Sequence, residues 1–190
     1  MRKITFDIET KNSFEEVEST DATKLDISVV CIHDSKTDKY DCFWEEDLDK
    51  LWPILEKADM LIGYNSDHFD IPLLNKYYNG DLTQIKSLDI LKEIYKKTGR
   101  RMKLDNIAEM TLGEKKSGHG MEAITWWKTG EKEKIKKYCL DDVRITKEVY
   151  DYAIKNNMLK WKDNGVLKEI KLDTSKWEEK EEKTITNSLF

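Results

Sequence analysis

The chain has 190 residues, enough for one domain with a buried core, and its six tryptophans, eight tyrosines and five phenylalanines argue against a disordered protein. Hydrophobic residues make up 38% and charged residues 37%, and no apolar stretch approaches the ~20 residues of a membrane-spanning helix. The net charge is −5, whereas nucleic-acid-binding proteins typically carry an excess of basic residues. An acidic metal site would account for part of this negative charge.

The three cysteines, Cys31, Cys42 and Cys139, are odd in number and show no CxxC spacing. This pattern predicts neither a zinc site nor a disulfide framework, and it favours a reducing compartment. The chain enters a predicted strand directly after Met1-Arg2-Lys3, so no signal peptide is expected. We therefore expect a cytoplasmic protein that does not bind a membrane.

The hydrophobic pattern places strands first and then alternates strands with helices. Strands are expected at residues 3–9, 27–33, 40–44 and 60–64. Helices are expected at residues 46–57, 70–78, 89–97, 104–112, 121–128 and 131–156. This order describes an α/β fold with a mixed β-sheet flanked by helices.

A C-terminal β-hairpin is expected at residues 158–162 and 166–172, around the turn Asp163-Asn164-Gly165. We therefore divide the chain into a main domain at 1–157, a hairpin extension of the same domain at 158–173, and a charged tail at 174–190.

Two acidic residues, Asp7 and Glu9, lie two positions apart in the first strand, Lys3-Ile4-Thr5-Phe6-Asp7-Ile8-Glu9. Residues two apart on a strand project from the same face, so the two carboxylates repel each other unless a cation lies between them. Hard oxygen ligands suit Mg²⁺ or Mn²⁺. The alternative is an exposed acidic edge of the sheet.

A second acidic segment, Asn65-Ser66-Asp67-His68-Phe69-Asp70, begins where the fourth strand ends and a helix starts. Asp67 or Asp70 could simply cap that helix, and Asn65 suits a turn. The segment alone does not distinguish a cap from a functional site.

The third segment, Tyr138-Cys139-Leu140-Asp141-Asp142, lies on the long helix. Tyr138 and Asp142 are four residues apart and share one face with the apolar residues Ile135, Ile145 and Val149. An aspartate within an apolar stripe requires a partner, either a buried salt bridge or a metal ion. Asp141 is expected to face solvent or to be paired.

Together the three segments resemble the motifs of the DEDD 3′–5′ exonucleases of the ribonuclease H-like (DnaQ-like) superfamily. Phe6-Asp7-Ile8-Glu9-Thr10 is similar to the first motif, Asn65 to Asp70 to the second, and Tyr138-x-x-x-Asp142 to the third in its tyrosine form. The histidine form would need His at position 137, which is lysine here. Within the superfamily, the chain looks closest to the exonuclease domain of B-family DNA polymerases and to stand-alone predicted exonucleases.

The resemblance implies a catalytic set of Asp7, Glu9, Asp70, Tyr138 and Asp142, in which the four acids bind two divalent cations, Mg²⁺ or Mn²⁺. Asp7 would contact both cations, Glu9 and Asp142 the cation that activates water, and Asp70 the second one. Tyr138 would orient the attacking water. Residues 1–157 would then be the exonuclease-like domain.

The resemblance also implies that Thr10, Asn65 and Phe69 contact the substrate, which is expected to be the 3′ end of single-stranded DNA or, less readily, RNA. A run of basic residues, Lys96, Lys97, Arg100, Arg101 and Lys103, is either a solvated helix end or a surface for phosphates.

Other functions remain open. The chain could be a catalytically weak or inactive nucleic-acid-binding module, or a subunit that is active only with a protein partner in repair or replication. An endonuclease of the same fold is a further alternative, against which Tyr138 argues, because endonucleases of this fold commonly lack the tyrosine.

Overall fold

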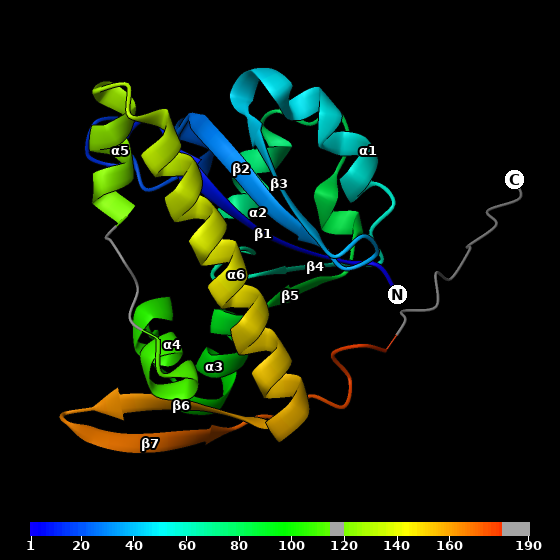
Figure 1. The fold of residues 1–190 in the computed structure, drawn as a ribbon, viewed down its shortest axis with the longest axis vertical. Helices are drawn as coiled ribbons and strands as arrows, with labels where there is room; N and C mark the ends of the chain where they lie inside the picture. Colours follow the sequence, from blue (N-terminus) through cyan, green and yellow to red (C-terminus); the bar gives the residue numbers. More distant parts are fainter. Residues whose placement is uncertain (115–119, 180–190) are drawn as a thin grey trace, which may run out of the picture.

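A five-stranded sheet forms the centre of the protein in the computed structural model, which describes residues 1–114 and 120–179 (Figure 1). The strand order is β3-β2-β1-β4-β5. Because β1 pairs antiparallel with β2 and parallel with β4, the sheet is mixed, as predicted. The strands are β1 (Lys3–Thr10), β2 (Ile27–Asp34), β3 (Lys39–Trp44), β4 (Met60–Gly63) and β5 (Ser87–Asp89).

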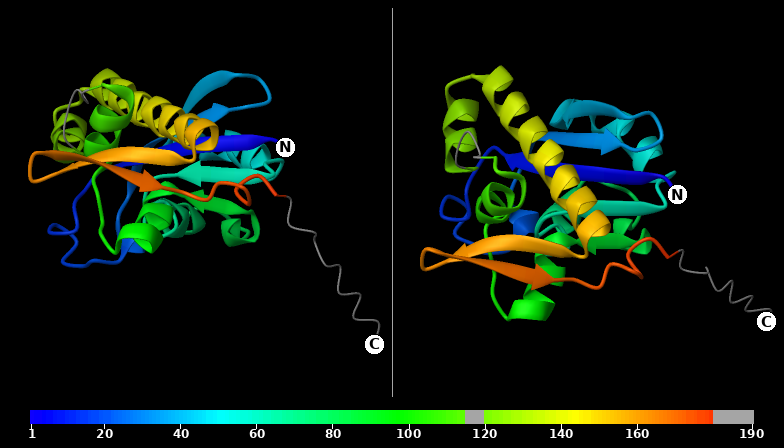
Figure 2. Two further views of the ribbon diagram at one scale, coloured as in Figure 1. Left: turned by 90° about the horizontal axis from the view of Figure 1, so that it is seen from below. Right: turned by 60° about the horizontal axis from the view of Figure 1, so that its bottom comes forward.

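Helices cover both faces of this sheet, with α6 and α2 on opposite sides (Figure 2). The α-helices are α1 (Trp52–Leu55), α2 (Asp70–Asn75), α3 (Ile90–Thr98), α4 (Leu104–Leu112), α5 (Gly120–Lys128) and α6 (Lys132–Asn156). Three short 3₁₀ helices are η1 (Ala22–Lys24), η2 (Glu45–Lys50) and η3 (Leu82–Gln84). None of the helices in the described ranges is both long and apolar enough to cross a membrane.

The central strand β1 is buried from both sides. Ile4, Phe6 and Ile8 pack in one cluster with residues of η2, α1 and α2. On the opposite face, Thr5 is 2% exposed and Glu9 is 8% exposed. The acidic pair of this strand therefore lies in the middle of the sheet, and the interpretation as an exposed acidic edge is wrong.

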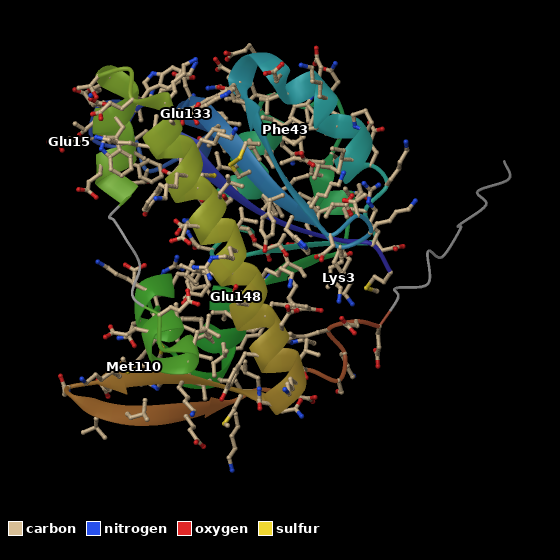
Figure 3. All side chains as sticks on the ribbon, viewed as in Figure 1. Lys3, Glu15, Phe43, Met110, Glu133 and Glu148 are labelled. Carbon is tan, nitrogen blue, oxygen red and sulfur yellow. A yellow bond between two sulfur atoms is a disulfide. The ribbon has the colours of Figure 1, made fainter. Side chains whose placement is uncertain are left out.

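The long helix α6 buries the stripe that its spacing predicts: Ile135, Tyr138, Asp142, Ile145 and Val149. Side chains fill the space between this helix and the sheet (Figure 3). Asn157 caps the C-terminus of the helix, and its φ of 53° is the left-handed conformation that asparagine tolerates better than most residues.

The predicted hairpin forms β6 (Met158–Asp163) and β7 (Val166–Lys171) as a separate two-stranded sheet. Side chains of α4 bond the outer edge of β6: the Lys160 amide donates to Thr111 Oγ1 at 2.9 Å, and the Lys162 amide donates to Asn106 Oδ1 at 2.8 Å. These bonds protect an edge that would otherwise expose unpaired backbone groups.

The first residues after the hairpin pack on the domain. Trp177 is 5% exposed and stacks on Tyr150, with ring centroids 6.0 Å apart. Glu178 accepts hydrogen bonds from Tyr150 at 2.7 Å and from Lys3 at 2.6 Å. The remainder of the predicted charged tail, 180–190, lies outside the described residues, as does much of the loop that follows α4.

Two predicted elements need correction, and one element was missed. The helix expected at 46–57 is instead η2 followed by the four-residue α1, and the helix expected at 70–78 ends at Asn75. The strand β5 was not predicted, because three residues are too few to show an alternating pattern. Its last residue, Asp89, is the N-cap of α3 and accepts a hydrogen bond from the Lys92 amide.

A disulfide joins Cys31 of β2 to Cys42 of β3, so the prediction that the cysteines form no disulfide is wrong. The two residues are direct partners in the antiparallel register, with Cα atoms 4.2 Å apart. That proximity follows from the strand register, which cysteine spacing alone does not reveal. Cys139 is a free, buried thiol.

The Arg2–Asp34 pair ties the start of β1 to the end of β2 and predicts a pH-dependent stability. The Arg2 guanidinium makes two hydrogen bonds to the carboxylate, at 3.1 and 2.7 Å, and holds the pKa of Asp34 below its ordinary value. We expect Asp34→Asn to lower the free energy of unfolding by about 1.5–3 kcal/mol at neutral pH. The difference should shrink as the pH falls below ~4 and through the depressed pKa of Asp34.

Urea unfolding near neutral pH and in acid would measure this difference. The exposed Asp41→Asn in β3 serves as the control and should match the wild type at both pH values. A loss of stability that is equal at both pH values would contradict the ion-pair explanation.

Candidate active site

Three carboxylates from two elements converge on one point. Asp7 and Glu9 project from β1 and Asp142 from α6, and carboxylate oxygens of the three lie within 4.8 Å of one another. Glu9 is 8% exposed and Asp142 is 5% exposed. Concentrating negative charge at a poorly hydrated point is unfavourable for the apo protein and favourable for binding a cation.

The helix α6 is held against β1 beside these acids. The Cys139 thiol lies 3.3 Å from the carbonyl oxygen of Asp7, to which it donates. Burial raises the pKa of this thiol well above its ordinary value, and the negative charges of Asp7, Glu9 and Asp142 raise it further. Cys139 is therefore a neutral packing residue within the field of the carboxylates.

Asp70 enters the site from a third element. It is the first residue of α2, is 4% exposed, and no side chain caps this helix. Burial raises the pKa of its carboxyl, whereas hydrogen bonds from its own amide and from that of Ile8 oppose the shift. The net effect is a pKa raised to about 8, so the carboxyl needs a nearby cation to be held in its charged form at neutral pH.

The capping role considered for Asp67 is not what the structure shows. Its carboxylate accepts from the Ser87 hydroxyl at 2.6 Å and pairs with Lys92 at 2.5 Å. The turn before α2 is instead held by Asp89, whose carboxylate accepts from the amides of Asn65 at 2.8 Å and Asp67 at 3.2 Å. Asn65 has a φ of 67°, which suits its prediction as a turn residue.

Tyr138 is 5% exposed and lies one helical turn before Asp142. The ring of Trp126 packs edge-on against it, with centroids 5.9 Å apart. Trp126 therefore packs against the site tyrosine. Asp141 points away from the cluster and pairs with Arg144 at 2.8 Å, in agreement with the prediction that it is solvent-facing or paired.

All eight predicted site residues line one cavity of about 860 Å³. They come from three segments: Asp7, Glu9 and Thr10; Asn65, Phe69 and Asp70; and Tyr138 and Asp142. The cavity opens because β4 pairs only with the first part of β1, at residues 3–5, and then turns away. Beyond that point no strand in the described part of the chain pairs with β1 on this side.

The cavity has further walls that the sequence interpretation missed. Phe14 follows β1 and packs edge-on against Phe69 at 5.9 Å, so two aromatic rings border the cavity. The segment 101–105 forms another wall, and Arg101 donates a hydrogen bond to Asn65 Oδ1. Arg101 belongs to the basic run of residues 96–103, which was the feature of the sequence that could have indicated its role at the site. No feature of the sequence indicated that Phe14 borders the cavity.

The donor set fits hard divalent cations. Asp7, Glu9 and Asp142 offer only oxygen atoms, and Asp70 adds a fourth carboxylate on the same cavity. Sulfur-preferring metals are disfavoured, because the nearby Cys139 thiol is protonated and directed at a backbone carbonyl.

Residues 4–154 match the family model of the RNase_H superfamily. The chain belongs to the RNase_H superfamily. This confirms the predicted ribonuclease H-like family and fold, and it supports a nucleic-acid hydrolase as the class of activity. No curated protein matches the sequence.

Among solved structures, the chain is similar to the family B DNA polymerase from the hyperthermophilic archaeon Pyrobaculum calidifontis. The TM-score is 0.63 at 19% sequence identity, over 81% of this chain and 24% of the polymerase chain. At this identity the likeness establishes the shared fold, and our chain spans about a quarter of the polymerase.

Metal binding can be tested with neighbouring aspartates of α6. We expect Asp142→Asn to weaken Mn²⁺ binding by more than ~10-fold, because it removes a charged oxygen ligand from the cluster. Asp141→Asn removes the same charge one residue away, from a side chain already paired with Arg144, and should bind as the wild type does. Titration calorimetry would measure both, and equal weakening would exclude a specific site at Asp142.

Proposed function

We propose that this protein is a metal-dependent 3′–5′ exonuclease that hydrolyses phosphodiester bonds at the 3′ end of single-stranded nucleic acid, DNA more readily than RNA. The observation that carries the proposal is the convergence of three motif segments on one cavity. The three segments are distant from one another in sequence, yet their eight side chains line the same cavity of about 860 Å³. A purely structural role would not require four carboxylates on such a cavity.

Four acids and one tyrosine have distinct roles in the proposed reaction. Asp7, Glu9 and Asp142 would hold one divalent cation, and Asp70 together with Asp7 would hold a second. Bound Mg²⁺ or Mn²⁺ supplies a hydroxide nucleophile and relieves charge at the leaving oxygen. Tyr138 orients the attacking water through its hydroxyl, because a phenol with a pKa near ~10 is a poor base at neutral pH.

The aromatic wall supports action at a strand end. Phe69 and Phe14 lie edge to face beside the acids, where they can pack against an unstacked terminal base. Thr10 is 8% exposed, and its hydroxyl donates to the Asn12 carbonyl at 2.9 Å, which fixes the chain between β1 and Phe14. Asn65 lies across the same cavity and holds the strand end.

The first test of the proposal is digestion of 5′-labelled single strands. With Mn²⁺ or Mg²⁺, the wild type should shorten linear DNA stepwise from the 3′ end and leave a circular single strand intact. Asp7→Ala and Asp142→Ala should each reduce the rate by at least ~10³-fold, because each removes several kcal/mol of cation-mediated stabilisation.

Asp141→Ala is the matched control and should retain the wild-type rate. Circular dichroism would establish that all variants are folded. Cleavage of circular strands would indicate an endonuclease, and retained hydrolysis in both cluster variants would refute the metal assignment.

Tyr138→Phe tests the role of the hydroxyl separately from that of the ring. The ring contact with Trp126 is preserved, while the hydroxyl that would orient the attacking water is removed. We expect kcat to fall by about 10–100-fold, the value of one hydrogen bond to a charged group, with unchanged Mn²⁺ affinity. Unchanged kinetics would remove Tyr138 from the mechanism.

A further inference from the structure

A second cavity, of about 250 Å³, lies next to the first. The two share Asn65, Leu91 and Arg101, so these residues form a common wall. The other residues that line the second cavity come from the turn before α2 and from the start of α3: Asp67, His68, Asp89, Lys92 and Tyr95.

The acids of this second cavity are already engaged by protein groups. Asp89 accepts from three backbone amides, those of Asn65, Asp67 and Lys92. Asp67 accepts from the Ser87 hydroxyl and pairs with Lys92. The carboxylate oxygens are therefore directed at protein donors, and Lys92 offsets the charge of Asp67.

Arg101 supplies the positive charge at the common wall. Its guanidinium donates to the neutral Asn65 Oδ1, and within residues 1–114 and 120–179 no carboxylate forms an ion pair with it. A guanidinium held by a neutral acceptor keeps donors for a second ligand, and its planar array of N–H groups suits a phosphate. The side chain is exposed, as phosphate binding requires.

Tyr95 provides an aromatic surface beside this charge. Its side chain is 51% exposed, whereas Ile90, Leu91 and Ile94 on the same helix are buried. The ring is therefore not needed for the packing of α3. An exposed ring next to a cation is the combination with which proteins bind single-stranded nucleic acid, because bases stack on the ring while the cation contacts the backbone.

We propose that the second cavity is a subsite for one nucleotide of the single strand, upstream of the two nucleotides that flank the scissile bond. This inference rests on the proposed exonuclease function. The base stacks on Tyr95, and Arg101 contacts the phosphate that joins this nucleotide to the part of the strand in the main cavity. Asn65 positions Arg101 between the two cavities.

The experiment compares a dinucleotide with an eight-nucleotide DNA strand, both hydrolysed with Mn²⁺. A dinucleotide occupies only the main cavity, whereas the longer strand also reaches the subsite. Tyr95→Ala should raise KM for the longer strand about tenfold and leave KM for the dinucleotide unchanged, since one stacked base is worth ~1–3 kcal/mol. Tyr95→Phe should restore the wild-type KM, because it keeps the stacking ring.

Arg101→Gln tests the phosphate contact in the same assay and should also raise KM more for the longer strand. Lys97→Gln is the matched control: it removes a positive charge from α3, the helix that carries Tyr95, and Lys97 lines neither cavity. Tyr40→Ala, which removes a 40% exposed tyrosine from β3, controls for loss of surface aromatic area. Both controls should behave as the wild type with either substrate.

The outcomes separate this inference from the proposed function. If the wild type digests both substrates and Tyr95→Ala affects them equally or not at all, the subsite is refuted and the exonuclease stands. If the wild type digests neither substrate, the exonuclease proposal fails. Fluorescence anisotropy of the labelled eight-nucleotide strand then tests the subsite directly: weaker binding by Tyr95→Ala than by Tyr40→Ala supports it, and equal binding overturns it.

Discussion

The placement of two carboxylates on a strand that is buried from both sides is the constraint on which the rest of the structure depends. Asp7 and Glu9 lie on the central strand of the sheet, where the half-buried Asp7 and the 8% exposed Glu9 lose part of their hydration and repel each other. The fold nevertheless brings Asp142 to the same point, and it seats α6 there through the Cys139 thiol and the Asp7 carbonyl. Such an arrangement is explained by the binding of cations and not by packing alone.

The cavity itself results from the early end of β4. This strand follows β1 for only three paired residues and then turns away at Gly63, where a side chain would come within 2.4 Å of Ser66. The tight turn through Asn65 brings α2 beside the unpaired edge of β1. There Asp70 accepts a hydrogen bond from the Ile8 amide, which satisfies a group that β4 would otherwise have bonded.

The sequence predicted the parts of the site that depend on local periodicity. Asp7 and Glu9 are two residues apart and share a strand face, because side chains of a strand alternate between its faces. Tyr138 and Asp142 are four residues apart and share a helix face, because that spacing is about one helical turn. The sequence could not predict what depends on tertiary register. Cys31 and Cys42 meet because two strands align them, and Phe14 borders the cavity because of the path of a loop.

Asp89 shows how a residue outside the three motifs can organise them. It lies at the end of β5, a strand too short to be recognised from its pattern, and burial raises the pKa of its carboxyl. Its carboxylate bonds the amide of Asn65 in the turn and that of Lys92 in the first turn of α3. The main cavity depends on that turn, and Tyr95 of the second cavity lies on that helix. A single buried acid with no place in the proposed chemistry therefore links the turn and the helix that border the two cavities, and these amide hydrogen bonds compensate for the burial that disfavours its charge.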